Sequence, residues 1–158
     1  MNQRMTTIRI LHLALLIPPI ALMGVFYFLR QSQGAGGEAP VALLYAAIAA
    51  ALAGPVASHV VSRQLFSAAA ARIKENLAIN EEQTALSYQT AKIVQWALLE
   101  GPAMFQAVVF YLIGEPVLLG LGGLLLALLG IQGPSLADLQ KRLEISSTRW
   151  RQIQAASG

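Results

Sequence analysis

The sequence predicts an all-α membrane protein with four transmembrane helices, and three observations lead to that prediction. Hydrophobic residues make up 56% of the 158-residue chain and charged residues only 12%, whereas a soluble domain usually carries about a quarter charged residues. Four apolar stretches approach the roughly 20 helical residues needed to cross a hydrocarbon core of about 30 Å. Nearly all basic residues fall on one side of these stretches. We therefore expect a single integral membrane domain, residues 1–158.

The four predicted spans lie at about 8–29, 40–62, 91–113 and 116–133. The fourth is the shortest and is rich in glycine, so we expect it to pack closely on a neighbouring helix. The first follows basic residues, as a secretory signal peptide does, but its apolar run is longer than the about 7–15 residues of a signal-peptide core. We expect it to remain in the protein as a span.

The positive charges indicate the orientation of the spans. Of the eleven Lys and Arg residues, only Arg30 lies on the outer side of the predicted topology. The positive-inside rule therefore places both termini and a helical connection at 66–90 in the cytoplasm, and we expect a bacterial inner membrane. Attraction to anionic lipid headgroups is a secondary expectation. The basic residues on the cytoplasmic side are Arg4, Arg9, Arg63, Arg72, Lys74, Lys92, Lys141, Arg142, Arg149 and Arg151.

An internal duplication organises the chain. A shift of 83 residues aligns "TIRILHLALLIPPIALMGVFYFL" with "TAKIVQWALLEGPAMFQAVVFYL". Pro19 then meets Pro102, and the basic Arg9 meets Lys92. Chance matches are common among leucines and alanines, but the paired prolines and basic residues favour a true repeat.

Each repeat is a two-helix hairpin, at about 7–65 and 90–142. Because both hairpins enter the membrane in the same direction, we expect parallel repeats about an axis along the membrane normal. The predicted architecture is a four-helix bundle with pseudo-two-fold symmetry. Close packing in this bundle is expected at small residues four positions apart, which include Ala46 with Ala50 and Ala103 with Ala107.

Local signals predict where several helices begin and end. Asn80 followed by Gln83 has the spacing of a capping box, which predicts a helix leading into the third span. Gly114 can adopt a positive φ and Pro116 is suited to a first helical turn, so the second hairpin is predicted to turn tightly between them. After the fourth span, Ser135 is a predicted N-cap of an amphipathic C-terminal helix at 135–154. Its apolar stripe consists of Leu136, Leu139 and Leu143.

Glu100 is the main candidate functional residue. It lies within the third predicted span, where a carboxylate is expensive and marks a functional site by default. Gln95, Gln106 and small residues share one arc of the helix with Glu100, and this arc is the predicted inner face. Gly101 and Pro102 follow directly and predict a kink, because proline removes one helical hydrogen bond.

Three roles for Glu100 remain open at this level. The acid could form an interhelical hydrogen bond that supports the kink, carry a proton or bind a cation, or contact another subunit. The aligned residue in the first repeat is Ile17. Whatever the acid does is therefore done by one half of the protein only.

Two resemblances concern the same segment. The stretch "ALLEGPAMFQAVVFYLIG", with the tail "GPSLADLQKRL", resembles small four-helix bacterial membrane proteins of unassigned function, over most of the chain. Locally, "ALLEGPAMFQAVV" looks like the second helix of the rotary ATPase proteolipid, the c subunit, whose membrane glutamate carries protons. That resemblance implies that Glu100 takes the carrier position. The chain departs from a proteolipid in lacking its polar Arg-Gln-Pro turn and in having only Gly24 in the first span, so the likeness is local.

No enzymatic activity or cofactor is expected. The chain has no cysteine, so disulfides and thiolate metal ligands are excluded, and His12 and His59 are too far apart in sequence for a recognisable metal motif. The sequence shows no nucleotide-binding loop and no nucleophile with a nearby base. No basic patch with interleaved aromatic residues is present, so nucleic acid is not an expected partner.

The sequence favours a non-enzymatic multi-pass membrane protein. We expect either an accessory or structural subunit of a membrane complex or a small stand-alone membrane protein. An alternative is a proton or ion pathway element that uses Glu100. A second alternative is a membrane anchor whose cytoplasmic helices recruit a soluble partner. The expected partners are the lipid bilayer and other membrane subunits or further copies of the chain.

Overall fold

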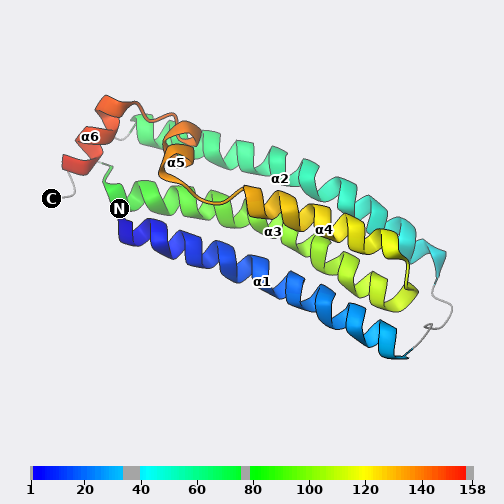
Figure 1. Cartoon of the computed structure of the whole chain (residues 1–158). Coiled ribbons are helices and arrows are strands. Elements are labelled where there is room, and N and C mark those ends of the chain that lie inside the picture. Colours follow the sequence, from blue (N-terminus) through cyan, green and yellow to red (C-terminus); the bar gives the residue numbers. More distant parts are fainter. Residues whose placement is uncertain (1, 34–39, 76–78, 156–158) are drawn as a thin grey trace.

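The computed structural model describes residues 2–33, 40–75 and 79–155, and all regular secondary structure within these ranges is helical. The helices follow the chain in a simple order (Figure 1). They are α1 (Asn2–Gln33), α2 (Val41–Glu75), α3 (Glu81–Ile113), α4 (Pro116–Ile131), α5 (Leu136–Arg142) and α6 (Ser147–Ala155).

The helices α1, α2 and α3 are long and apolar enough to cross a membrane. A fourth span is present if α4 and α5, which meet at a bend of 89°, are counted as one broken span. The four predicted apolar stretches are therefore helical, but α4 alone has 16 residues, fewer than the about 20 of a usual span. Both α2 and α3 extend into the predicted helical connection at 66–90.

The helix α3 lies at the centre of the packing (Figure 1). It contacts α1, α2 and α4, whereas α1 and α2 make almost no direct contact within the described residues. This differs from the predicted bundle of two packed hairpins, because α3 separates the two helices of the first hairpin. The helices α1 and α3 run parallel, with Tyr27 stacked on Phe110 and Phe26 on Tyr111. The helices that match in sequence therefore lie side by side.

Two glycines allow the close approach of α2 and α4 to α3. A Cβ at Gly54 would lie 2.8 Å from Cγ of Pro102, and a Cβ at Gly122 would lie 3.2 Å from Cβ of Gln106. Both distances are too short for an unperturbed contact between carbon atoms. Larger side chains at these glycines would push the helices apart, which gives one physical reason why α3 is surrounded by its neighbours.

The alanine pattern predicted the buried face of α3 but not that of α2. Ala103 and Ala107 are fully buried, as predicted. On α2, Ala46 is exposed, while Ala47 and Ala51 are buried. Because α2 is rich in alanine all round, spacing alone could not show which row faces α3.

The helix ends predicted at Asn80, Gly114, Pro116 and Ser135 are confirmed. Asn80 caps α3: its side chain accepts a hydrogen bond from the backbone N–H of Gln83 at 2.9 Å, and the Gln83 side chain accepts one in return. Gly114 ends α3 with φ of +82°, and Pro116 is the first residue of α4. Ser135 caps α5. These features depend on near neighbours in the chain, which is why the sequence predicts them well.

Arg30, the basic residue on the outer side of the predicted topology, caps the other end of α3. Its guanidinium donates hydrogen bonds to the carbonyl oxygens of Tyr111 at 2.9 Å and Ile113 at 3.0 Å. A cation at a helix C-terminus satisfies free carbonyls and opposes the negative end of the helix dipole. A Cβ at Gly114 would collide with this guanidinium. Arg30 thus joins the end of α1 to the end of α3.

The predicted single C-terminal helix at 135–154 was wrong, because the chain forms two short helices there. The break contains Glu144, which has φ of +51°. Leu143 and Ile145 on either side of it are both buried. The turn at Glu144 allows α5 and α6 to change direction, so that the apolar residues of each can pack on the bundle. A straight amphipathic helix has a single apolar stripe, so it could not pack the apolar residues of both α5 and α6 on the bundle.

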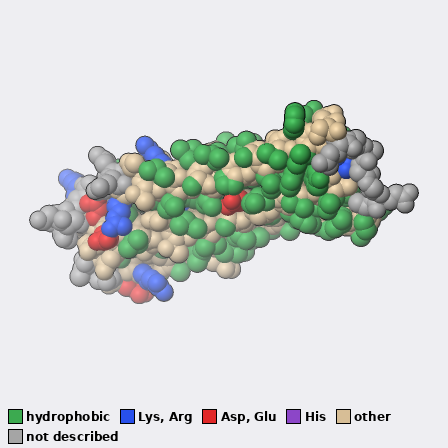
Figure 2. Space-filling model, turned by 90° about the horizontal axis from the view of Figure 1, so that it is seen from below, with side chains coloured by type: hydrophobic (Ala, Val, Ile, Leu, Met, Phe, Trp, Pro, Cys, Tyr) green, Lys and Arg blue, Asp and Glu red, His purple; other side chains and the backbone are tan. Residues whose placement is uncertain are grey.

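Apolar side chains cover the long helices, and the charged side chains gather mainly at one end of the molecule (Figure 2). Phe28, Leu52 and Ile131 on three different helices are 72%, 67% and 80% exposed. Soluble monomers rarely expose continuous apolar patches larger than a few hundred Å². This surface is compatible with an integral membrane protein.

Candidate functional site

The surroundings of Glu100 differ from those of Gln95 and Gln106, the two glutamines predicted to share its face. Gln95 and Gln106 are buried on α3, while Glu100 is only half-buried. Within the described residues, no hydrogen bond or ion pair involves the Glu100 carboxylate. The prediction that the acid lies on the inner face with the glutamines was therefore wrong.

Helix geometry explains this difference. At 100° per residue, Glu100 lies about 140° from Gln95, while Gln106 lies about 20° from Gln95. The residue at about 120°, Ala107, is still buried, whereas Met104 at about 180° is 36% exposed. Glu100 therefore occupies the edge of the buried arc, where α3 begins to face outward.

The two glutamines lie at the contact of α3 with α2. Gln106 Nε2 donates a hydrogen bond of 2.6 Å to the carbonyl oxygen of Ala47, and the Ser58 hydroxyl donates one of 2.9 Å to the carbonyl oxygen of Gln95. The side-chain oxygens of both glutamines are buried and accept no hydrogen bond from the described part of the chain. Gln106 therefore joins α3 to α2 through its side chain, whereas Gln95 does so only through its backbone carbonyl.

Gly101 and Pro102 do not interrupt α3, which continues as one helix to Ile113. Pro102 faces α2 and packs against Gly54. Around Gly101, a Cβ would meet open space. Pro102 thus contributes to the contact between α3 and α2. The kink expected at Gly101 and Pro102 stays a prediction.

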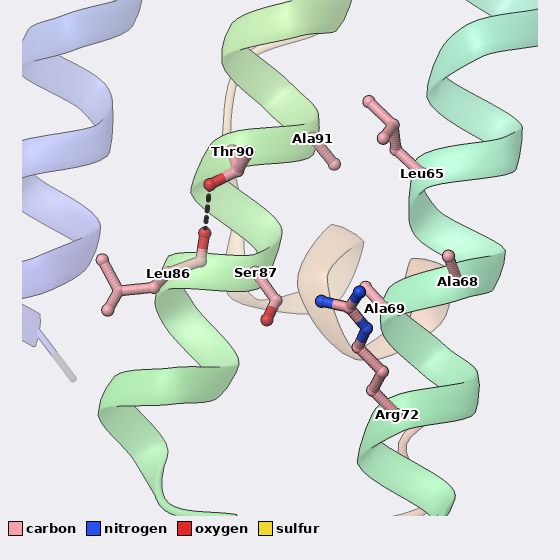
Figure 3. A pocket seen from close by; sticks show the side chains of 8 residues that line it. All are labelled: Leu65, Ala68, Ala69, Arg72, Leu86, Ser87, Thr90 and Ala91. Carbon is pink, nitrogen blue, oxygen red and sulfur yellow. Dashed lines mark hydrogen bonds between the residues drawn. The ribbon is translucent and has the colours of Figure 1, made fainter.

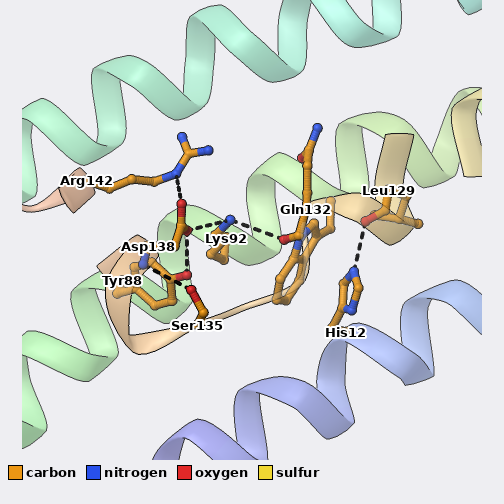
Figure 4. A network of polar contacts seen from close by, with 9 residues as sticks. His12, Tyr88, Lys92, Leu129, Gln132, Ser135, Asp138 and Arg142 are labelled. Carbon is orange, nitrogen blue, oxygen red and sulfur yellow. Dashed lines mark hydrogen bonds and ion pairs between the residues drawn. The ribbon is translucent and has the colours of Figure 1, made fainter. Parts of the chain in front are cut away.

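Sequence reasoning missed a polar network where α5 meets α3 (Figure 4). Its centre is Lys92, whose side chain is 1% exposed and whose Nζ lies 2.9 Å from Oδ2 of Asp138. The same carboxylate oxygen accepts a hydrogen bond of 2.7 Å from the Tyr88 hydroxyl. The other carboxylate oxygen lies 2.9 Å from Nε of Arg142. Asp138 therefore accepts from three side chains.

The network continues along α3 to the end of α4. The carbonyl oxygen of Gln132 accepts hydrogen bonds from Lys92 at 3.2 Å and from Trp96 Nε1 at 3.3 Å. The ring of Trp96 contacts that of His12 with centroids 4.6 Å apart, and His12 Nε2 lies 2.9 Å from the carbonyl oxygen of Leu129. The side chains thus satisfy carbonyls that the end of α4 leaves free.

The electrostatic balance keeps Asp138 ionised. Burial by itself would raise the pKa of the Asp138 carboxyl, but the three hydrogen bonds that it accepts outweigh burial and hold the pKa below its ordinary value. The guanidinium of Arg142 also lies 5.0 Å from the centre of the Phe66 ring on α2, within the range of a cation–π interaction. This cluster holds α3, α4 and α5 together and reaches α1 and α2.

Part of this network could have been found in the sequence. Tyr88, Lys92 and Trp96 are spaced four residues apart, which places them on one face of a helix. In the sequence, however, Lys92 indicates only the orientation and the repeat, and Asp138 is the third residue of a capped helix. The partner of Lys92 is far away in sequence, so only the bend after α4 reveals the pair.

Within residues 2–33, 40–75 and 79–155, no three metal-ligating side chains lie together in a way that could hold an ion. His59 is exposed, whereas His12 is buried against Trp96. No known family model, curated protein or solved structure matches this chain.

Proposed function

We propose that the protein is a non-enzymatic accessory or structural subunit of a membrane complex, with four spans in a bacterial inner membrane and both termini in the cytoplasm. The observation that carries the subunit role is Glu100, a half-buried carboxylate at the outward edge of a long apolar helix. Figure 2 shows acidic surface within the apolar band, away from the charged ends.

The position of Glu100 favours a contact with another chain. A carboxylate near the centre of a bilayer costs up to about 3 kcal/mol on insertion scales. The cations Lys92 and Arg30 are occupied by Asp138 and by the end of α3, respectively. A membrane helix with a hydrogen-bond donor at the depth of Glu100 would offset this cost.

The orientation is supported by the charges and can be tested cleanly. Because the chain has no cysteine, a single introduced cysteine gives labelling without background. We expect a membrane-impermeant maleimide to label Glu115→Cys in intact spheroplasts and to label Gln152→Cys only after lysis. The reverse pattern, or labelling of both in intact spheroplasts, would disprove the proposed topology.

The subunit role is tested by in-membrane cross-linking. Met104 lies one helical turn beyond Glu100 and is exposed, so a photoreactive residue there should form a defined adduct with a second membrane protein. Phe28 on α1, also exposed, is the matched control position. We expect the Met104 adduct to disappear in Glu100→Leu and to persist in Glu100→Gln, which keeps hydrogen bonding. An adduct that is unaffected by Glu100→Leu would contradict the proposal.

The proton or ion pathway is the second candidate, and the half-buried position of Glu100 at the edge of the helix packing favours it over a purely internal packing role. It predicts that Glu100→Gln abolishes proton or ion flux in reconstituted vesicles while assembly is unchanged. The subunit proposal predicts no flux in either protein. The same variant therefore separates the two functions.

A further inference from the structure

A groove separates α2 and α3 near the end of the molecule that carries most of the charges (Figure 3). Its volume is about 300 Å³, within the lower range of small-molecule pockets. Its walls are mainly apolar, with one cation and two hydroxyl groups. The residues that line it are Leu65, Ala68, Ala69, Arg72, Leu86, Ser87, Thr90 and Ala91.

Arg72 supplies a positive charge that the described chain does not neutralise. Figure 3 shows its guanidinium extending from α2 across the groove toward Ser87 on α3. No carboxylate forms an ion pair with Arg72 in the described ranges. The cation is thus available to an anion that enters the groove.

The two hydroxyl groups complement this cation. The Ser87 hydroxyl donates to the carbonyl oxygen of Gln83 at 2.9 Å, and the Thr90 hydroxyl donates to that of Leu86 at 3.0 Å. Since each hydroxyl hydrogen is already used, the oxygens remain as acceptors. A ligand that combines a negative charge with its own hydroxyl donors would match these groups.

The depth of the groove matches the headgroup layer of the proposed membrane. The third span is predicted to begin at about residue 91, so Ser87 lies roughly 6 Å outside the hydrocarbon. The headgroup layer is about 5–8 Å thick on each side. The Cα of Arg72 on α2 lies roughly 15 Å beyond residue 62, the predicted end of the second span. Because helical side chains point toward the N-terminus of their helix, its guanidinium extends back toward the headgroup layer.

We propose that this groove binds one anionic phospholipid of the cytoplasmic leaflet. The phosphate pairs with Arg72, headgroup hydroxyls donate to Ser87 and Thr90, and the glycerol backbone lies along Leu65, from which the acyl chains continue into the hydrocarbon. Arginine binds phosphate oxygens through charge-assisted hydrogen bonds. The proposal rests on the proposed membrane placement, but it does not depend on the role of Glu100.

The test uses the full chain, purified in neutral detergent and titrated with phosphatidylglycerol or phosphatidylcholine. Bound lipids are counted by native mass spectrometry. We expect one phosphatidylglycerol to bind with preference over phosphatidylcholine, and Arg72→Gln to weaken it about tenfold or more, as for loss of a charge-assisted hydrogen bond. Arg63→Gln is the matched control, because Arg63 is nine residues away and faces the opposite side of α2. The Arg63→Gln variant should change the affinity for phosphatidylglycerol less than about twofold.

A second variant tests the shape of the groove without changing its charge. Ala68 is exposed on the groove wall, so Ala68→Trp should fill the groove and weaken phosphatidylglycerol binding while Arg72 remains. Unchanged helicity and melting temperature establish that each variant is folded. Binding that is unaffected by Ala68→Trp would overturn the proposal even if Arg72→Gln failed to fold.

Other occupants give distinguishable results. Equal weakening by Arg72→Gln and Arg63→Gln would mean diffuse attraction of anionic lipid and would overturn the groove site. Displacement of the lipid by millimolar inorganic phosphate or by an acidic peptide, in place of a lipid preference, would identify a soluble anion as the ligand. Labelling of Arg72→Cys by a membrane-impermeant maleimide in intact spheroplasts would instead refute the membrane placement, independently of lipid binding.

Discussion

Asp138 and Glu100 are two carboxylates in partly apolar surroundings, but they differ in the partners that the fold gives them. Asp138 accepts hydrogen bonds or ion pairs from Lys92, Tyr88 and Arg142. Glu100 has no such partner within the described residues. One acid is therefore part of the fold, while the other faces the edge of the molecule.

The difference indicates where each charge obtains its compensation. A buried ion pair is tolerated only when its geometry and additional hydrogen bonds offset desolvation, and the Asp138 network meets that condition inside one chain. Glu100 receives no such compensation from the described part of its own chain, which is the reason for the proposed contact with another chain. The comparison predicts that Asp138 stabilises this protein and that Glu100 does not.

The largest effect is expected for Asp138→Ala, which should lower the free energy of unfolding by about 3 kcal/mol. The cause is that Lys92, which is 1% exposed, would keep a buried charge without its partner. Denaturant unfolding in detergent measures the loss. The double variant Lys92→Met with Asp138→Ala should lose less free energy of unfolding than Asp138→Ala alone. If the losses of the two single variants simply added, the two residues would not be coupled.

Acidification should remove the contribution of ionised Asp138 to the free energy of unfolding more gradually. Because the folded pKa of Asp138 lies below its ordinary value, its contribution is complete above the unfolded value of about 3.9 and is lost as the pH falls through the lowered folded value. The unfolding midpoint, measured from pH 7 to pH 2, should fall more steeply in the unmodified protein than in Asp138→Asn. Parallel curves would refute this assignment.

A smaller effect of opposite sign is expected for Glu100→Leu. Removing an uncompensated carboxylate from an apolar edge should raise the stability of the isolated protein by about 1 kcal/mol, a part of the insertion cost of a charged residue. The same substitution should abolish the cross-link at Met104. A loss of stability comparable to that of Asp138→Ala would show that Glu100 has an essential partner within its own chain.

The smallest effect is expected at a third carboxylate, Glu144, which pairs with Lys74 on the surface. The pairing lowers the pKa of Glu144 through the hydrogen bond and charge of Lys74. Both side chains are well exposed, so water and salt screen the pair. The melting temperature of Glu144→Gln should match that of the unmodified protein within error. A clear decrease would contradict the expectation that an exposed ion pair contributes little to stability.

Several parts of the fold followed from local sequence. The capping box at Asn80, the positive φ at Gly114 and the first turn at Pro116 each depend on residues within a few positions. Glu100 was also identified from the sequence as an unusual residue in an apolar helix. Its surroundings were not, because an error of a few tens of degrees in the assumed inner face moves a side chain from the core to the edge.

The sequence by itself determined the helical class, the apolar stretches, the helix caps and the concentration of basic residues near the predicted cytoplasmic side. These features arise from hydrogen bonds between near neighbours and from composition, both of which can be read along the chain. Only the tertiary structure decided that α3 lies between α1 and α2 and that Lys92 meets Asp138. Alanine occurs on several faces of α2, and the two charges are joined by a bend in the chain, so only three-dimensional packing selects among the possible contacts.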